Sequence, residues 1–333
     1  MRNVTIIIVV AAVAIAALLM LHFHHAALPA KPALQVAKAT QPRALFKRIN
    51  QPKMVTVTRR PAVKLAPFSR LNPWSDIQLI MDTQADFHKR LDAIGRLPAK
   101  LTDADWRALR NFLLKPDPSD NDQLGQVVKN SLMDKFCEMH PTPSGLNTVF
   151  AQMGKDAKQD EVVRDYAYQH LATFDEELAA QNGQAIAKEE QTDQKALWNA
   201  LFETSDSIAG TALIGLQRLS QAGEQVNSNQ LSGMALEMAN DPNAGELTLI
   251  TAYQVCAQRE VQQALPTIEA AAQSSETISV QISAIGALGT MGGANDIPLL
   301  QNLLQGNDER LTLPAQTAIN RIEQRLQLQA SIR

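Results

Sequence analysis

Apolar residues recur at intervals of three and four from about Trp74 to the end of the chain, which is the period of amphipathic α-helices. Segments rich in Pro, Gly, Asn and Asp interrupt this pattern, for example at residues 115–121, 141–145 and 240–245. None of them is flanked by the alternating pattern of a strand. Ala, Leu and Gln are abundant, and residue types that favour strands are scarce beyond the N-terminus. The pattern therefore predicts an all-α protein.

The helical pattern begins within residues 74–100. Ser75 and Gln78 have the spacing of a capping box, and the apolar residues from Ile77 to Ile94 keep roughly helical spacing. We therefore expect one N-terminal capping helix over residues 74–100, followed by a repeat domain over residues 101–333.

A large, small, large triplet spaced by four residues recurs along this second region. The triplets are Val163, Ala167 and Leu171; Ile208, Ala212 and Leu216; Thr248, Ala252 and Cys256; Val280, Ala284 and Leu288; and Pro314, Ala318 and Ile322. Their central alanines are 45, 40, 32 and 34 residues apart. A small residue at the centre of a helix face lets a neighbouring helix approach closely, so the triplets predict a helix that repeats and packs against its own copies.

A second amphipathic stretch precedes each of these helices, and an earlier pair at residues 103–139 fits the same alternation. The chain therefore contains about six helix pairs. One pair cannot bury its apolar face alone, whereas stacked pairs form a continuous core. Residues 175–194 lengthen one interval and indicate either a longer pair or an exposed insertion.

The segment ISVQISAIGALGTMGGANDIPLLQNLLQGNDERLTLPAQTAINRI resembles HEAT repeats, a family of helix pairs. The likeness is good over roughly residues 246–325 and is weaker back to about Thr102. It implies a right-handed α-solenoid. Asp160 and Arg164 match the acidic and arginine positions that link successive repeats in this family. The chain departs from that pattern at Gln281, where Arg is expected, and a regular ladder of such contacts is therefore not assured.

Four glycines lie between Ile282 and Pro298. No strand precedes them and no Lys-Ser or Lys-Thr follows, as a phosphate-binding loop requires. We interpret Gly286 and Gly289 as positions of close helix packing, and Gly292–Gly293 as the end of that helix. Asn295 or Asp296 then caps the next one.

Residues 1–28 contain an uncharged apolar segment, Val4–Leu21, that is 18 residues long. As a helix it extends for roughly 27 Å, close to the thickness of the bilayer hydrocarbon. Leu28-Pro29-Ala30 is a poor cleavage site. The segment therefore favours an uncleaved single-pass anchor over a cleaved signal peptide, which remains the alternative and would give a secreted or periplasmic form. We expect the body to lie on the extracytoplasmic side, in a bacterial envelope.

Residues 29–73 form a basic linker with repeated KPA, QPR, QPK and RPA units. Lys31 to Arg70 includes ten basic residues and no acidic one, whereas the chain from Asp76 onward has 20 basic and 34 acidic residues, a net charge of −14. Repeated proline and like charge favour an extended, unpacked chain. The linker could bind an anionic surface, but it lacks the interleaved aromatic residues typical of nucleic-acid binding, and no nucleic acid is expected.

The polar residues do not form a recognisable catalytic motif. Cys137 and Cys256 occupy apolar periodic positions, and Cys137-x-x-His140 has no second ligand pair. His88, His140 and His170 occur at unrelated positions without a nucleophile motif. We therefore expect no enzyme, no metal and no cofactor.

The resemblance instead implies a membrane-tethered scaffold that binds proteins or peptides over a broad surface. Two alternatives remain: a HEAT-like lyase that handles a tetrapyrrole or another ligand, and a passive envelope spacer. The candidate partner-binding residues, all expected to be exposed near the second helix of a pair, are Arg164, Asp165, Tyr168, Gln217, Arg218, Tyr253, Gln254 and Arg321.

Overall fold

Helices make up all the regular structure in the part of the chain that is described. The computed structural model describes residues 73–118, 122–182, 188–223, 225–275, 277–306 and 308–332. The predicted anchor and nearly all of the predicted linker lie outside these ranges. Within them, no helix is both long enough and apolar enough to cross a membrane.

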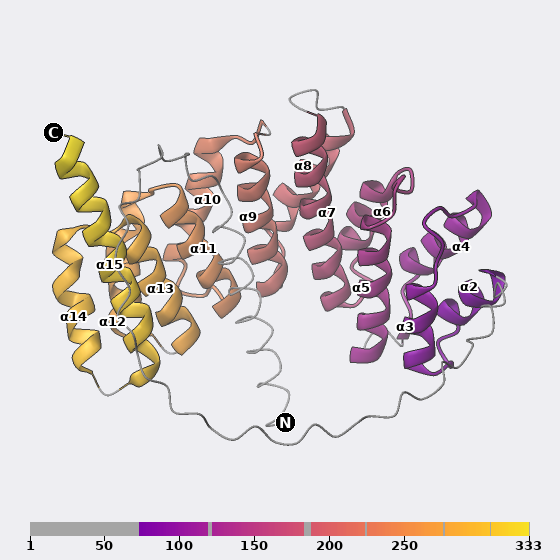
Figure 1. Ribbon diagram of the computed structural model, residues 1–333, viewed down its shortest axis with the longest axis horizontal. Helices are drawn as coiled ribbons and strands as arrows, with labels where there is room; N and C mark the ends of the chain where they lie inside the picture. The colour runs from indigo at the N-terminus through magenta and orange to yellow at the C-terminus, as the bar shows by residue number, and fades with distance from the viewer. Residues whose placement is uncertain are drawn as a thin grey trace, which may run out of the picture. The chain divides into compact units, whose positions relative to one another are not determined.

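Within these ranges fourteen α-helices alternate between two layers (Figure 1). The even-numbered helices are α2 (Pro73–Met81), α4 (Asp103–Leu114), α6 (Leu146–Lys155), α8 (Lys188–Ala200), α10 (Ser228–Asn240), α12 (Leu265–Gln273) and α14 (Ile297–Gln305). The odd-numbered helices are α3 (Phe87–Gly95), α5 (Gln123–Cys137), α7 (Glu161–Asn182), α9 (Asp206–Gln221), α11 (Glu246–Gln258), α13 (Ile278–Met291) and α15 (Glu309–Ile332). Two short 3-10 helices, η3 (Gln262–Ala264) and η4 (Ala294–Asp296), lead into α12 and α14.

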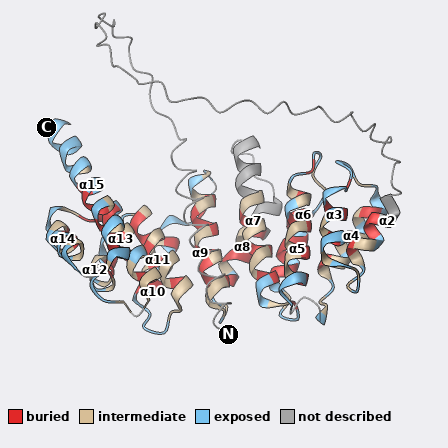
Figure 2. Ribbon diagram, turned by 60° about the horizontal axis from the view of Figure 1, so that its bottom comes forward, coloured by how far each residue is buried: buried red, intermediate tan, exposed pale blue. Residues whose placement is uncertain are grey.

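Each even-numbered helix forms a pair with the odd-numbered helix that follows it. Six of the seven pairs pack closely along their backbones, and in the α4–α5 pair the rings of Trp106 and Phe136 meet edge to face with their centroids 5.1 Å apart. Consecutive odd-numbered helices also pack on each other from α3 to α15, and the buried residues lie between the two layers (Figure 2). The described chain thus has seven pairs, one more than the sequence predicts.

The recurring triplets form the buried centre of the odd-numbered helices. Ala167, Ala212, Ala252, Ala284 and Ala318 are all buried, and so are the large residues on either side of them, apart from Pro314. The spacing of the triplets therefore correctly predicted which side of each helix packs into the core.

The prediction of one capping helix over residues 74–100 needs correction, because this segment forms two helices. α2 ends at Met81, and α3 begins at Phe87 with Asp86 as its N-cap, whose carboxylate accepts a hydrogen bond from the Lys89 backbone N–H at 3.1 Å. The two helices pack on each other as an additional pair. Both bury apolar residues at helical spacing, so the periodicity continues across the turn and conceals it.

Two helices account for the described part of residues 175–194, and residues 183–187 lie outside the described ranges. α7 extends for 22 residues to Asn182, and α8 begins at Lys188. The longer interval between repeats is therefore a longer pair, and the alternation of the layers continues through it.

The glycines of α13 differ in their surroundings. A Cβ atom at Gly289 would lie 2.9 Å from the Cα of Ala318, which agrees with the close packing that we expected. At Gly286, in contrast, no atom lies within 4 Å of the position of a Cβ, so the prediction of close packing there is wrong. The helix ends before Gly292, and Asp296 accepts a hydrogen bond from the Gly293 backbone N–H at 2.6 Å at the start of η4.

Candidate functional site

The eight candidate partner-binding residues divide into a buried and an accessible group. Arg164, Tyr168, Gln217 and Tyr253 are buried, Asp165, Arg218 and Gln254 are half-buried, and Arg321 is exposed. The expected exposure is therefore wrong for the first four. A helix in the middle of the stack has its paired helix and two odd-numbered neighbours around it, which leaves only a narrow strip accessible to solvent.

Arg164 joins its own pair to the next one. Its Nε donates to the backbone oxygen of Gly154 at 2.8 Å, near the C-terminal end of α6, and its Nη2 lies 2.7 Å from an oxygen of Glu203 in the loop after α8. A cation at the C-terminal end of a helix stabilises the unpaired carbonyls there. Arg164 is thus part of the framework between repeats.

Three other pairs place a donor at a similar point. Arg90 donates to the backbone oxygen of Ile80, Lys129 donates to those of Leu113 and Lys115, and Gln281 donates to that of Ala272. Each acceptor lies at or near the end of the even-numbered helix of the same pair. Gln281 lacks the positive charge of the arginine expected at this position, but its amide still donates a hydrogen bond near the C-terminal end of α12.

Tyr168 and Gln217 are held inside the stack. The Tyr168 ring covers Gly154, where a Cβ would come within 2.7 Å of the ring carbon Cζ, and burial raises the pKa of Tyr168 to about 12. Gln217 accepts from Nη1 of Arg259 at 2.9 Å, and the same guanidinium donates through Nε to Ser232 at 2.8 Å. These contacts connect helices, and they leave both side chains out of reach of a partner.

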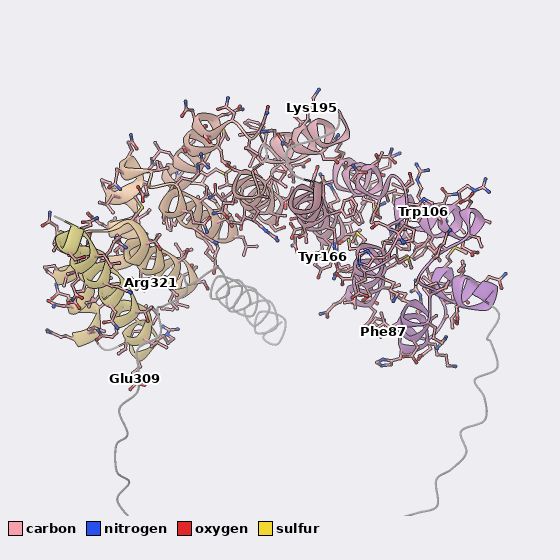
Figure 3. All side chains as sticks on the ribbon, turned by 45° about the horizontal axis from the view of Figure 1, so that its top comes forward. Phe87, Trp106, Tyr166, Lys195, Glu309 and Arg321 are labelled. Carbon is pink, nitrogen blue, oxygen red and sulfur yellow. The ribbon has the colours of Figure 1, made fainter. Side chains whose placement is uncertain are left out.

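The accessible surface of the odd-numbered helices is a strip of positions in a fixed register with the triplets, which we call the odd-helix face. It consists of Val127, Asn130, Ser131 and Asp134 on α5 and Glu138 directly after it; Val162, Asp165, Tyr166, Gln169 and Thr173 on α7; Ser207, Thr211, Ile214 and Arg218 on α9; Leu247, Ile250, Thr251, Gln254 and Gln258 on α11; Ser279, Ile282, Ser283, Gly286 and Thr290 on α13; and Leu313, Gln316, Thr317, Asn320 and Gln324 on α15. Figure 3 shows Tyr166 of this face on the opposite side of the body from Lys195 of α8.

The two ends of the odd-helix face differ in charge. The part on α5 and α7 contains Asp134, Glu138 and Asp165, whereas the face positions on α11, α13 and α15 have no charged side chain. Ile282 and Leu313 on that uncharged part are 36% and 75% exposed.

The carboxylate of Asp165 is partly buried and only one of its oxygens accepts a well-formed hydrogen bond. One carboxylate oxygen accepts from the Gln169 amide at 3.0 Å, and the other is buried without a hydrogen bond of normal geometry. Burial raises the pKa of Asp165, although the side chains of Thr211 and Gln169 oppose this shift. Its position between α7 and α9 makes it a packing residue as much as a surface one.

One row across the uncharged part has a gap at its centre. Gln254, Gly286 and Asn320 occupy equivalent positions on three successive odd-numbered helices. Because Gly286 has no side chain and no atom within 4 Å of where a Cβ would lie, the row presents an amide, an open notch and a second amide. The sequence shows these residues, but it does not show that they share a row.

A second group of residues, which the sequence did not bring together, lies between α5 and α7. The Sγ of Cys137 is 4.0 Å from Nδ1 of His170, and Nε2 of the same ring is 2.9 Å from Oδ1 of Asn130. Asp134 lies 3.6 Å from that Nε2. Asn130, Asp134 and Cys137 are spaced by four and three residues on one side of α5, which is the only sign of this group in the sequence.

Two shallow hollows open on the described surface. One of about 290 Å³ lies between α3 and α5 and includes Leu91, Ile94 and Asp134, and another of about 410 Å³ lies beside α14 and includes Leu299 and Asn302. Among the residues that the structure describes, no group of three or more His, Cys, Asp or Glu side chains is gathered closely enough to hold a metal ion.

No protein-family model matches the chain, and no curated protein matches it. Several solved structures are similar at low sequence identity. An engineered protein is 15% identical with a TM-score of 0.40, and the alignment covers 76% of this chain and 98% of that one. Kap121p is 15% identical with a TM-score of 0.37 over 76% of this chain and 34% of its own. Human deoxyhypusine hydroxylase is 16% identical with a TM-score of 0.31 over 76% and 96%.

The class of the protein follows from its helix pairs. Stacked pairs, with one layer of helices in continuous contact and a buried alanine at the centre of each helix from α7 to α15 in that layer, define an α-solenoid. The described part of the chain is an α-solenoid of stacked helix pairs, as the repeated pattern in its sequence predicts.

Proposed function

We propose that this protein is a scaffold that binds an extended segment of a partner protein across the uncharged part of the odd-helix face. The observation that carries the proposal is the row of Gln254, Gly286 and Asn320, with its open centre. A carboxamide both donates and accepts hydrogen bonds, as a peptide group does. The amides on either side can therefore bond a backbone that passes through the notch.

The dimensions of the row suit a peptide. Packed helices lie about 8–10 Å apart, so the distance from α11 to α15 is roughly 16–20 Å. An extended chain rises about 3.3 Å per residue, and five or six residues therefore cover this distance. The exposed Ile282 and Leu313 lie on the same helices and offer apolar contacts for side chains of the partner.

We further propose that Val4–Leu21 anchors the protein in a membrane and that the basic linker holds the body away from it on the extracytoplasmic side. These segments lie outside the described residues, and the proposal rests on their sequence alone. Extraction of membranes with alkaline carbonate tests it: an anchored protein stays with the membrane, and a cleaved protein is released.

The face is tested by filling its notch. Gly286→Phe places a large ring where no protein atom lies nearby, so the fold should be retained while the peptide path is blocked. Gly233→Phe on α10 is the matched control, because Gly233 is exposed and likewise has no atom within 4 Å of a Cβ. Proximity labelling in cells identifies the proteins that lie next to the wild-type body. These neighbours should be missing for Gly286→Phe and should be retained for Gly233→Phe.

The alternative functions predict other outcomes. A passive spacer would show no neighbour that depends on Gly286. A lyase that uses a cysteine could use only Cys137, because Cys256 is fully buried in the core, and it would be purified with a bound or coloured ligand. The proposed scaffold has no catalytic activity of its own.

A further inference from the structure

The turns within the helix pairs differ in charge from the turns between pairs. By sequence, the turns within pairs contain 11 acidic and two basic residues, whereas the turns between pairs contain four acidic and three basic ones. Nine of the 11 acidic residues lie within the described ranges. Because each pair is a hairpin and the odd-numbered helices stack side by side, the turns within pairs share one edge of the stack (Figure 1). These turns and the first two residues of each odd-numbered helix form what we call the turn edge.

Contacts between neighbouring repeats make the turn edge continuous from α5 to α11. The Gln126 amide donates to Oδ1 of Asp160 at 3.0 Å, and Oγ of Ser205 donates to Oε1 of Glu161 at 2.5 Å. Asp206 accepts from two backbone N–H groups at the start of α11. Each of these bonds joins the first turn of one odd-numbered helix to the turn edge of the next repeat.

These hydrogen bonds leave the negative charge of the turn edge in place. The groups that donate to Asp160, Glu161 and Asp206 are an amide, a hydroxyl and backbone N–H groups, and none of them carries a charge. Glu203 differs, because it is paired with Arg164. Acidic side chains are favoured at the N-terminal ends of helices in any protein, so the acids alone do not define a binding site.

Exposed apolar side chains accompany the acids, and helix capping does not account for them. Leu124 and Val162 are the second residues of α5 and α7 and are 48% and 37% exposed. Leu247 has the same position on α11 and is half-buried, and Phe202, in the turn before α9, is 73% exposed. Four successive repeats therefore each have one accessible apolar side chain at this edge. Single exposed apolar residues are ordinary, whereas apolar side chains gathered in a strip are typical of an interaction surface.

We propose that the turn edge from α5 to α11 is a second interaction surface, and that its partner is a protein segment in which Lys and Arg alternate with apolar residues. The acids attract basic side chains and repel nucleic acid and anionic lipid headgroups, whose charge has the same sign. The apolar strip contacts the apolar side chains of the segment. Neighbouring helices lie about 8–10 Å apart, so an apolar residue at about every third position of an extended segment reaches each repeat.

The turn edge borders the odd-helix face and shares Val162 and Leu247 with it. It does not include the row of Gln254, Gly286 and Asn320. The two surfaces can therefore be tested separately, and Gly286→Phe should leave binding at the turn edge unchanged.

A synthetic peptide added to the full-length protein tests the proposal. The peptide has about 20 residues, with Leu at every third position and Lys between, and fluorescence anisotropy measures its Kd. Two control peptides have Glu in place of Lys or Ser in place of Leu. The first peptide should bind about tenfold or more tightly than either control, and added salt should weaken its binding. Equal affinity of the peptide that lacks Leu would show an unspecific attraction to charge and would overturn the proposal.

Apolar variants locate the surface. Phe202→Ser should weaken binding of the peptide by about fivefold or more, as the loss of an apolar anchor does. Leu328→Ser is the matched control, because it changes an exposed leucine near the far end of α15 and should leave the Kd unchanged. Equal effects of the two substitutions would contradict the proposed location.

Charge variants test the acids in the same way. Glu161→Gln combined with Glu246→Gln should weaken binding by about two- to fivefold for each charge at low salt. Glu138→Gln combined with Glu323→Gln removes the same charge from exposed positions towards the other ends of α5 and α15, and it should have no effect. Equal losses in the two double variants would refute the role of the turn edge.

The basic residues of the chain itself require one further variant. Replacing the ten basic residues between Lys31 and Arg70 by Gln should leave the Kd of the peptide within about twofold of the wild-type value. A gain of about tenfold in affinity would mean that these residues compete for the turn edge, and the proposal of a separate partner would be wrong.

Discussion

Gly289 of α13 lies directly against Ala318 of α15, so that a Cβ at position 289 would come within 2.9 Å of the Ala318 Cα and 3.1 Å of its Cβ. The nearest atom belongs to the backbone of α15, which cannot move away without shifting the helix. Glycine, which has a hydrogen atom in place of a Cβ, is therefore required at position 289 for α13 and α15 to pack at this distance.

Gly289→Ala should destabilise the protein even though alanine favours helices. Overpacking of a tight contact costs about 1–3 kcal/mol, which exceeds the gain of up to about 1 kcal/mol in helix propensity. Gly286→Ala on the same helix is the matched control and should raise stability, because its Cβ meets no other atom. Thermal unfolding followed by circular dichroism measures both. A Gly289→Ala variant at least as stable as the wild type would contradict the tight contact.

Arg164→Met should weaken the junction between the α6–α7 pair and the loop before α9. It removes a buried charged hydrogen bond to Gly154 and the ion pair with Glu203, at a cost of about 1.5–3 kcal/mol. Glu203→Gln keeps the hydrogen bond to Gly154 and removes only a partly exposed ion pair, so its effect should be below about 1 kcal/mol. Urea denaturation compares the two variants. Equal losses would show that the ion pair, and not the helix-end bond, stabilises the junction.

The sequence predicts the order of helices well because the spacing of large and small residues is a local property. The triplet around Ala284 shows which side of α13 is buried, and it leads directly to the contact of Gly289 with the following repeat. The break between α2 and α3 escapes the same reasoning. The apolar residues of both helices keep the same helical spacing in the sequence, and the turn at residues 82–86 does not interrupt it.

Exposure could not be read from the sequence in the same way. The burial of Arg164 and Tyr168 depends on residues elsewhere in the chain, because both contact Gly154 of α6 and Arg164 also contacts Glu203 after α8. The contact of Cys137 with His170 joins residues 33 positions apart, and it depends on the relative rotation and register of α5 and α7. A single sequence shows the periodicity of each helix. The relative rotation and register of two helices are determined only by how they pack.

His170 should make the stability of the protein depend on pH between about 6.5 and 4. Its pKa is lowered to about 4 in the folded state, so as the pH falls through this range the unfolded chain binds a proton that the folded chain does not. Stability is therefore lost on acidification, by an amount on the order of 3 kcal/mol at pH 4, and no further loss from this residue follows below that.

The His170→Gln variant isolates this effect. It should be less stable than the wild type at neutral pH, and the gap between their unfolding free energies should narrow on acidification to pH 4. Asp134 and Asp165, whose pKa values are raised mainly by burial, act in the opposite direction in both proteins, so the difference between the two curves is the quantity to measure. A constant gap for His170→Gln would show that the ring is not shielded from water.

Asp206 at the start of α9 should prove to be a cap for the next repeat. Its carboxylate accepts from the backbone N–H groups of Leu247 and Thr248 at 2.8 and 2.9 Å, two donors that α11 leaves unpaired at its N-terminal end. Asp206→Ala should cost about 1–2 kcal/mol of unfolding free energy, in the range of lost N-caps. Asp206→Asn should cost about half as much, because an amide has one acceptor oxygen instead of two. Asp103→Asn in the first turn of α4 changes an exposed acid at a helix start and should have little effect. Equal stability of the Asp206→Ala variant and the wild type would mean that water caps α11 as well as the neighbouring repeat does.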